Sequence, residues 1–176
     1  FRSFGHTLKK GEEVLIQWEY PQGSLPIPIA SFYIGFQEPS RTQAEEIASA
    51  VELAATSDVA IVFVGTTAEI ESEGHDRKNI SLPDGQDQLV AAVAKVAKRT
   101  IVVVNSGSPV EMPWFKDVDS VLFTFFGGQQ MGNALADVIY GKVNPAACTT
   151  TTWAKQMSDL PVVNTTPNNG ELHYSE

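Results

Sequence analysis

Three short apolar runs alternate with amphipathic stretches in the middle of the chain. The runs are DVAIVFVG (58–65), TIVVVNSG (100–107) and SVLFTFFGG (120–128). The spacing of the apolar residues predicts helices within 41–57, 84–99 and 129–141, and Gly141 is placed to end the last of them. Strands apolar on both faces that alternate with amphipathic helices are typical of a parallel sheet covered by helices. The pattern therefore predicts an α/β protein, a three-layer α/β sandwich with a mainly parallel sheet.

The two ends of the chain have a different pattern. Residues 1–40 contain two β-type runs, EEVLIQWEY (12–20) and ASFYIGF (30–36), which predict a short antiparallel β segment before the α/β domain at 41–160. CTTTTWAK (148–155) could add one more strand, and the Pro-, Asn- and Thr-rich residues 161–176 are typical of a linker or strap. Because two strands alone are only marginally stable, we expect residues 13–36 to be covered by a homodimer partner, by another chain or by the Pro- and Asn-rich tail.

A charged segment, EIESEGHDR (69–77), directly follows the first apolar run. In an open parallel sheet, ligands bind beyond the carboxyl ends of the strands, which is where this segment is expected. Like charges held close together do not all ionise easily, so we expect one carboxyl of this segment to have a raised pKa, as a general acid requires. Charge alone favours the simpler interpretation, a solvated surface loop.

Charge and composition exclude several classes of function. The net charge of −9 disfavours binding to nucleic acid, and no apolar run approaches the length that spans a bilayer. The three histidines are far apart in sequence, so we expect no metal site, and no pattern indicates a cofactor. The sequons at Asn79 and Asn164 slightly favour a secreted or extracellular glycoprotein. The chain begins at Phe1 without methionine, which suggests a processed or excised piece of a longer protein.

Other motifs carry weaker signals. GGQQMG (127–132) lacks the lysine and the glycine spacing of a phosphate-binding loop. The serines of NSGSP (105–109) have no histidine nearby in sequence, which disfavours a serine hydrolase. Trp114 could stack on a sugar, but burial under a loop is the better interpretation.

Several longer motifs point to a known family: ESEGHDR, QDQLV, NSGSPVEMPW and GNALADVIYGKVNP. With the sequence between them, they resemble the C-terminal α/β-sandwich domain of glycoside hydrolase family 3 β-glucosidases. The first 40 residues resemble the end of the protective-antigen-like β-sandwich that many members insert in this domain.

The resemblance implies a carbohydrate or other small-molecule ligand and a retaining mechanism that uses two carboxylates. The nucleophilic aspartate of the family lies on a separate barrel, and the acid/base glutamate comes from a loop of the α/β domain. Within 69–77, Glu73 matches the acid/base position and Glu71 is the second choice, whereas Asp76 and Arg77 match the Asp–Arg pair that braces the loop. Asp76 is a further catalytic candidate. We expect Glu69, His75 and Arg77 to bind the substrate.

Two departures from the family pattern leave the function open. Phe126-Gly127-Gly128 stands where the family usually has Tyr-Pro-Gly, and Ala146–Thr149 stands where it usually has Gly-Lys-Leu-Pro. The chain is therefore expected to be a β-glucosidase domain that does not hydrolyse without a barrel. Alternatively, it is a free-standing derivative that binds a sugar or small molecule, or that uses the acidic loop for isomerisation or cyclisation, or a degenerate remnant.

Overall fold

The computed structural model of the chain describes residues 9, 11–15, 41–74, 76–160 and 167–171. The chain divides into two compact units, Phe1–Glu38 and Pro39–Glu176. In the first unit the described residues form a turn, in which the amide of Glu12 donates to the carbonyl of Lys9 at 3.0 Å and Gly11 has a φ of +83°. Residues 12–15 form no strand, and the other positions of both expected N-terminal strands lie outside the described residues.

The second unit contains a parallel sheet of three strands in the order β1-β2-β3. They are β1 (Ala60–Gly65), β2 (Thr100–Asn105) and β3 (Ser120–Phe123), with Ala60 opposite Thr100 and Ile101 opposite Ser120. The helices are α1 (Gln43–Thr56), α2 (Gln86–Ala94) and α3 (Met131–Ile139), and a short 3-10 helix, η1, spans Met157–Asp159. The predicted α/β sandwich with a parallel sheet is confirmed.

Local sequence explains where the helices begin and end. Thr42 caps α1 through a capping box with Glu45, whose carboxylate accepts a 2.7 Å hydrogen bond from the amide of Thr42. Gly141 lies just after α3 with a φ of +72°, a backbone conformation that glycine adopts without strain, so the predicted stop is confirmed. Helix α2 is shorter than predicted and ends at Ala94, which leaves Val96 beyond the helix and exposed.

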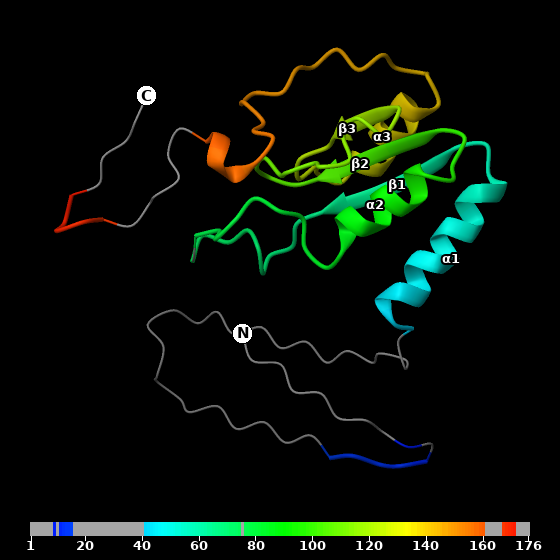
Figure 1. Cartoon of the computed structure of the whole chain (residues 1–176), viewed down its shortest axis with the longest axis horizontal. Coiled ribbons are helices and arrows are strands. Elements are labelled where there is room, and N and C mark those ends of the chain that lie inside the picture. The colour runs from blue at the N-terminus through cyan, green and yellow to red at the C-terminus, as the bar shows by residue number, and fades with distance from the viewer. Residues whose placement is uncertain (1–8, 10, 16–40, 75, 161–166, 172–176) are drawn as a thin grey trace. The chain divides into compact units, whose positions relative to one another are not determined.

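The core lies between the sheet and the adjacent pair of helices α1 and α2 (Figure 1). Its buried members are mostly valines with one tryptophan: Ala54, Val62, Val64, Leu82, Val90, Val93, Val102, Val104, Val110 and Trp114. Trp114 is 2% exposed, and its indole N–H donates to Asp87 of α2 at 2.7 Å, so the expectation that it is buried is confirmed. The β2–β3 connection is thereby anchored to α2.

The opposite face of the sheet differs from the expectation that every strand is covered twice. Val103 of β2 is buried on that face, but Ile61 and Phe63 of β1 are 41% and 63% exposed. In β1 alternate residues are buried, so the described residues cover one of its faces and leave the other exposed. Apolar side chains on both faces of a strand therefore did not by themselves predict that both faces are covered.

The predicted additional strand at residues 148–155 is wrong. This segment has no strand structure. Its Trp153 packs against Phe123 at the end of β3, with 3.9 Å between the centroids of the two rings. Of the predicted strap, the described residues 167–171 form a turn in which Asn168 and Glu171 exchange backbone hydrogen bonds of 2.9 and 3.0 Å.

The core tryptophan gives a direct test of this packing. We expect Trp114→Ala to lower the free energy of unfolding by about 3–5 kcal/mol, because a large buried side chain leaves a cavity. Trp114→Phe should cost less, since it fills most of the volume but leaves Asp87 without its indole donor. Urea denaturation measures both effects.

The neighbouring Phe115, which is 55% exposed, supplies the control. Phe115→Ala should change the free energy of unfolding by no more than about 0.5 kcal/mol. Equal costs for Trp114→Ala and Phe115→Ala would contradict the described core.

Candidate functional site

The charged loop begins where β1 ends, and that end is held on both sides. The side-chain amide of Gln86, the first residue of α2, accepts from the Gly65 amide at 2.7 Å and donates to the Gly65 carbonyl at 3.1 Å. A β-carbon at Gly65 would overlap the carbonyl of Asn105 in β2, so the close strand approach requires glycine here. The chain therefore leaves the sheet from a fixed point.

The first part of the loop is a hydrogen-bonded turn. The amides of Ile70 and Glu71 both donate to the carbonyl of Thr67 at 2.9 Å, which places Glu69 in the turn. This turn directs the side chain of Glu71 back toward the sheet, where it meets the residues that follow β2.

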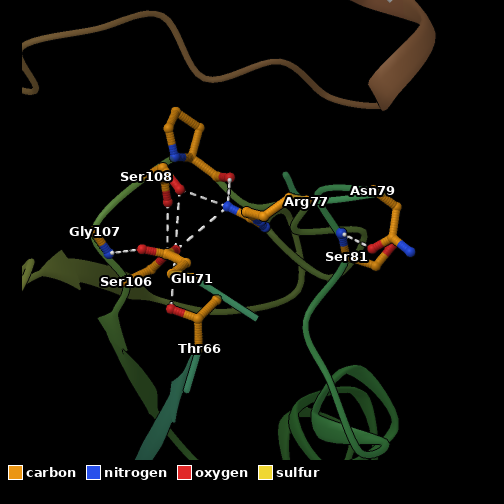
Figure 2. A network of polar contacts seen from close by, with 9 residues as sticks. Thr66, Glu71, Arg77, Asn79, Ser81, Ser106, Gly107 and Ser108 are labelled. Atoms are coloured by element: carbon orange, nitrogen blue, oxygen red, sulfur yellow. Dashed lines mark hydrogen bonds and ion pairs between the residues drawn. The ribbon is translucent and has the colours of Figure 1, made fainter. Parts of the chain in front are cut away.

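Glu71 is the centre of the site (Figure 2). Its Oε1 accepts from the hydroxyls of Thr66, Ser106 and Ser108 at 3.0, 2.9 and 3.0 Å. Its Oε2 accepts from the amide of Gly107 at 3.1 Å. The carboxylate thus joins the loop after β1 to the loop after β2.

Arg77 completes the same network from the far end of the charged segment. Its Nη1 lies 3.4 Å from Oε1 of Glu71 and also donates to the Ser108 hydroxyl at 2.6 Å and the Pro109 carbonyl at 3.2 Å. The side chains of Arg77 and Glu71 are only 15% and 13% exposed, so water screens this pair less than a surface pair. Arg77 therefore links the end of the charged segment to Glu71 and to the loop after β2.

These contacts determine the ionisation of Glu71. Burial by itself raises the pKa of the carboxyl, but the hydrogen bonds from Ser106, Thr66 and Ser108, together with the charge of Arg77, outweigh it. The net pKa of Glu71 lies below its ordinary value. Glu71 is therefore suited to remain an anion and not to donate a proton near neutral pH.

The other expected site residues lie in the same segment of the sequence as Glu71. Glu69, Glu73 and Asp76 are exposed, and Gly74 between the last two donates its amide to the Ser72 hydroxyl at 3.2 Å. His75 lies outside the described residues. Sequence reasoning missed the parts played by Thr66, Ser106 and Ser108, although a polar NSGS segment directly after a buried strand is a signal for them.

Further features bear on cofactors and membranes. Among the described residues, no three His, Cys, Asp or Glu side chains gather as metal ligands would. No helix in the described ranges has the length and apolar character that crossing a membrane requires. An apolar groove of about 300 Å³ lies over α1 and β1, lined by residues such as Leu53 and Phe63, and includes none of the charged-loop residues.

The chain is similar to known proteins over most of its length. The family model described as "Glycosyl hydrolase family 3 C-terminal domain" matches residues 7–176. A β-glucosidase from Kluyveromyces marxianus is 37% identical over 97% of this chain, and thermostable β-glucosidase B from Acetivibrio thermocellus is 48% identical over 66% of it. The chain spans only 21% and 16% of the lengths of these two relatives.

Solved structures give a concordant result. The crystal structure of the Kluyveromyces marxianus β-glucosidase in complex with glucose matches 69% of this chain and 15% of that chain, with a TM-score of 0.67 and 41% identity. A β-glucosidase from Streptomyces venezuelae, solved with D-glucose, matches 58% of this chain and 13% of that chain, with a TM-score of 0.55 and 43% identity.

The network around Glu71 gives a prediction for stability. We expect Glu71→Gln to lower the free energy of unfolding by about 1–3 kcal/mol at pH 7, because the amide replaces an ionised acceptor and turns a donor toward N–H groups. Because folding lowers the pKa of Glu71, its contribution is present above the ordinary pKa and is lost as the pH falls through the folded value. The difference between variant and wild type should therefore shrink in acid, as urea titrations at a series of pH values would measure.

Glu73→Gln is the matched control, since Glu73 lies on the same loop and is exposed. It should leave the free energy of unfolding within about 0.5 kcal/mol of wild type. A cost for Glu71→Gln that stays the same from pH 7 to pH 3 would show that the charge of Glu71 is not what stabilises the loop.

Proposed function

The chain belongs to the glycosyl hydrolase family 3 C-terminal domain family, and from this premise we propose that it supplies the acid/base loop of a retaining β-glucosidase. The nucleophile comes from a barrel domain outside these residues. A retaining mechanism places its two carboxyl groups about 5 Å apart on either side of the glycosidic bond. One loop from one domain therefore provides one half of the reaction.

The observation that carries the proposal is the difference in exposure and hydrogen bonding among the glutamates of the loop. Glu71 is anchored by hydrogen bonds from both loops, while Glu69 and Glu73 on either side of it are exposed. An anchored anion fixes the loop, whereas an exposed carboxyl lies at the surface, where a substrate can contact it. This supports the exposed pair, and not Glu71, as the source of the proton.

Two arguments distinguish the exposed glutamates. Glu73 matches the acid/base position in the motif comparison and has small neighbours, Ser72 and Gly74, that leave room for a substrate. Glu69 lies in a turn fixed by backbone bonds to Thr67 on one side and by the Glu71 network on the other. Because a catalytic group must be held closely in position, the geometry favours Glu69, and both carboxyl groups enter the test.

A second candidate function rests on Ala146–Thr149, which replaces the Gly-Lys-Leu-Pro pattern expected after Asn144-Pro145. All four residues are exposed, and the segment after them has no strand structure. A change in a patterned loop favours a derivative of the family domain that binds a sugar or a small molecule without hydrolysing it. Hydrolysis by the full-length gene product separates the two candidates.

The decisive experiment compares three variants of the chain joined to its barrel domain: Glu69→Gln, Glu71→Gln and Glu73→Gln. Removal of a general acid typically lowers the rate by a factor of about 10²–10⁴. Either Glu69→Gln or Glu73→Gln should therefore lower kcat for an aryl β-glucoside by such a factor. The loss should be greater for a substrate with a poor leaving group, because that leaving group needs the proton more.

The 176-residue chain alone is the negative control and should show no turnover, because one member of the catalytic pair is absent. Retention of full activity by both Glu69→Gln and Glu73→Gln would exclude the proposed acid/base role of this loop. Absence of activity in the wild-type full-length protein would favour the second candidate.

A further inference from the structure

The end of β1 is held by a side chain that takes the place of a neighbouring strand. The amide of Thr66 donates to the carbonyl of Asn105 at 3.1 Å, so the backbone amide of Thr66 faces β2. In a parallel pair, alternate residues of a strand bond to the same neighbour, and the backbone groups of Gly65 therefore face the other side. On that side β1 is the edge of the described sheet, and Gln86 bonds to both backbone groups of Gly65.

The side-chain amide of Gln86 has the chemistry that this position requires. A carboxamide carries one acceptor oxygen and one donor nitrogen on the same carbon. Its oxygen accepts from the Gly65 amide at 2.7 Å, and its nitrogen donates to the Gly65 carbonyl at 3.1 Å. These are the two kinds of contact that a neighbouring strand would make. A carboxylate in the same place would offer no donor, and a thioether would offer no donor and only a weak acceptor.

Gln86 is itself held in place by the turn that precedes α2. Its backbone amide donates to the carbonyl of Pro83 at 3.2 Å, and the side-chain amide of Gln43 in α1 donates to the carbonyl of Asp84. Gly85 has a φ of +70°, and a β-carbon there would overlap the side chain of Gln43. Helix α1 and this turn therefore fix the residue that holds the end of β1.

The contact at Gly65 determines where the charged loop starts. The next residue, Thr66, donates its hydroxyl to Glu71, and the carbonyl of Thr67 accepts from the amide of Glu71. Glu69 lies within this turn. A shift of the backbone at Gly65 would therefore move the carboxyl groups of the loop. A displacement of about 1 Å can lower an enzymatic rate by a factor of about 10².

We propose that Gln86 is a positioning residue for the reaction: its side-chain amide stands in for a strand at Gly65 and thereby holds the acid/base carboxyl of the charged loop within reach of the leaving-group oxygen. The proposal rests on the proposed function, because it takes the charged loop as the source of the acid. Gln86 touches neither the substrate nor the acid in this account and acts through the backbone of Gly65. It therefore affects proton transfer to the leaving group.

Kinetics of the chain joined to its barrel domain test this role. Gln86→Glu keeps the size of the side chain and replaces the donor nitrogen by oxygen, and Gln86→Met removes the amide. Phenyl β-D-glucoside has a leaving group that needs a proton, whereas the leaving group of 2,4-dinitrophenyl β-D-glucoside departs without one. We expect both variants to lower kcat/KM for the phenyl compound by a factor of about 10–10², and for the dinitrophenyl compound by less than about threefold. A variant that is only less stable would lower both values by the same factor.

Gln88→Glu is the matched control, because Gln88 lies on the same helix, is exposed and undergoes the same change of charge. It should leave kcat/KM for both glycosides within about twofold of wild type, as is usual for exposed positions. Hydrogen exchange measured by mass spectrometry on the same proteins gives a second readout. The peptide that covers residues 60–71 should exchange faster in both Gln86 variants than in wild type, and the peptide that covers 100–105 should not.

Three results would each overturn the proposal. They are an equal loss with the two glycosides, no loss with the phenyl compound, and faster exchange of residues 100–105 in both Gln86 variants, which would show a role in the fold as a whole. If Glu69→Gln or Glu73→Gln lowers the rate but the Gln86 variants do not separate the two glycosides, the acid/base role stands and the positioning role falls. If both glutamate variants keep full activity, the acid/base role falls and this inference falls with it.

Discussion

The charged loop depends on one partly buried anion, the carboxylate of Glu71. The acidic side chains of the loop repel one another. The loop therefore needs a fixed attachment if any of these side chains is to hold a defined position. Glu71 provides it by accepting from Thr66 beside its own strand and from Ser106, Gly107 and Ser108 beside the next strand. Arg77 then closes the segment onto the same carboxylate. The loop is anchored at its middle and its end, and its remaining acidic side chains are exposed.

This arrangement explains why the acidic loop follows a buried strand. Parallel strands bring their carboxyl ends together, so hydroxyl and amide donors after β2 are available to an acceptor that follows β1. The rigid sheet supplies the fixed points to which the loop is attached. In the proposed function, such a domain provides one positioned carboxyl, and the other carboxyl comes from another domain.

The elements of the α/β unit were predictable from sequence because each follows from local periodicity. The three strands, the three helices and the stop at Gly141 all lie in the expected ranges. The role of Glu71 was not predictable in this way, since three glutamates at alternate positions look alike until their neighbours in space are known. The exposure of Phe63 and the absence of a strand at 148–155 were missed for a similar reason, because both depend on which elements pack against the segment and not on its own pattern.

The central claim is that Glu71 is an ionised anchor, and its side-chain carboxyl resonance tests this most directly. In a carbon-detected NMR titration the Glu71 carboxyl should titrate below the ordinary value of about 4.3 for glutamate. The amide proton of Gly107, which donates to Oε2, should shift with the same midpoint. A Glu71 carboxyl that titrates at or above the ordinary value, with no matching transition at Gly107, would contradict the account.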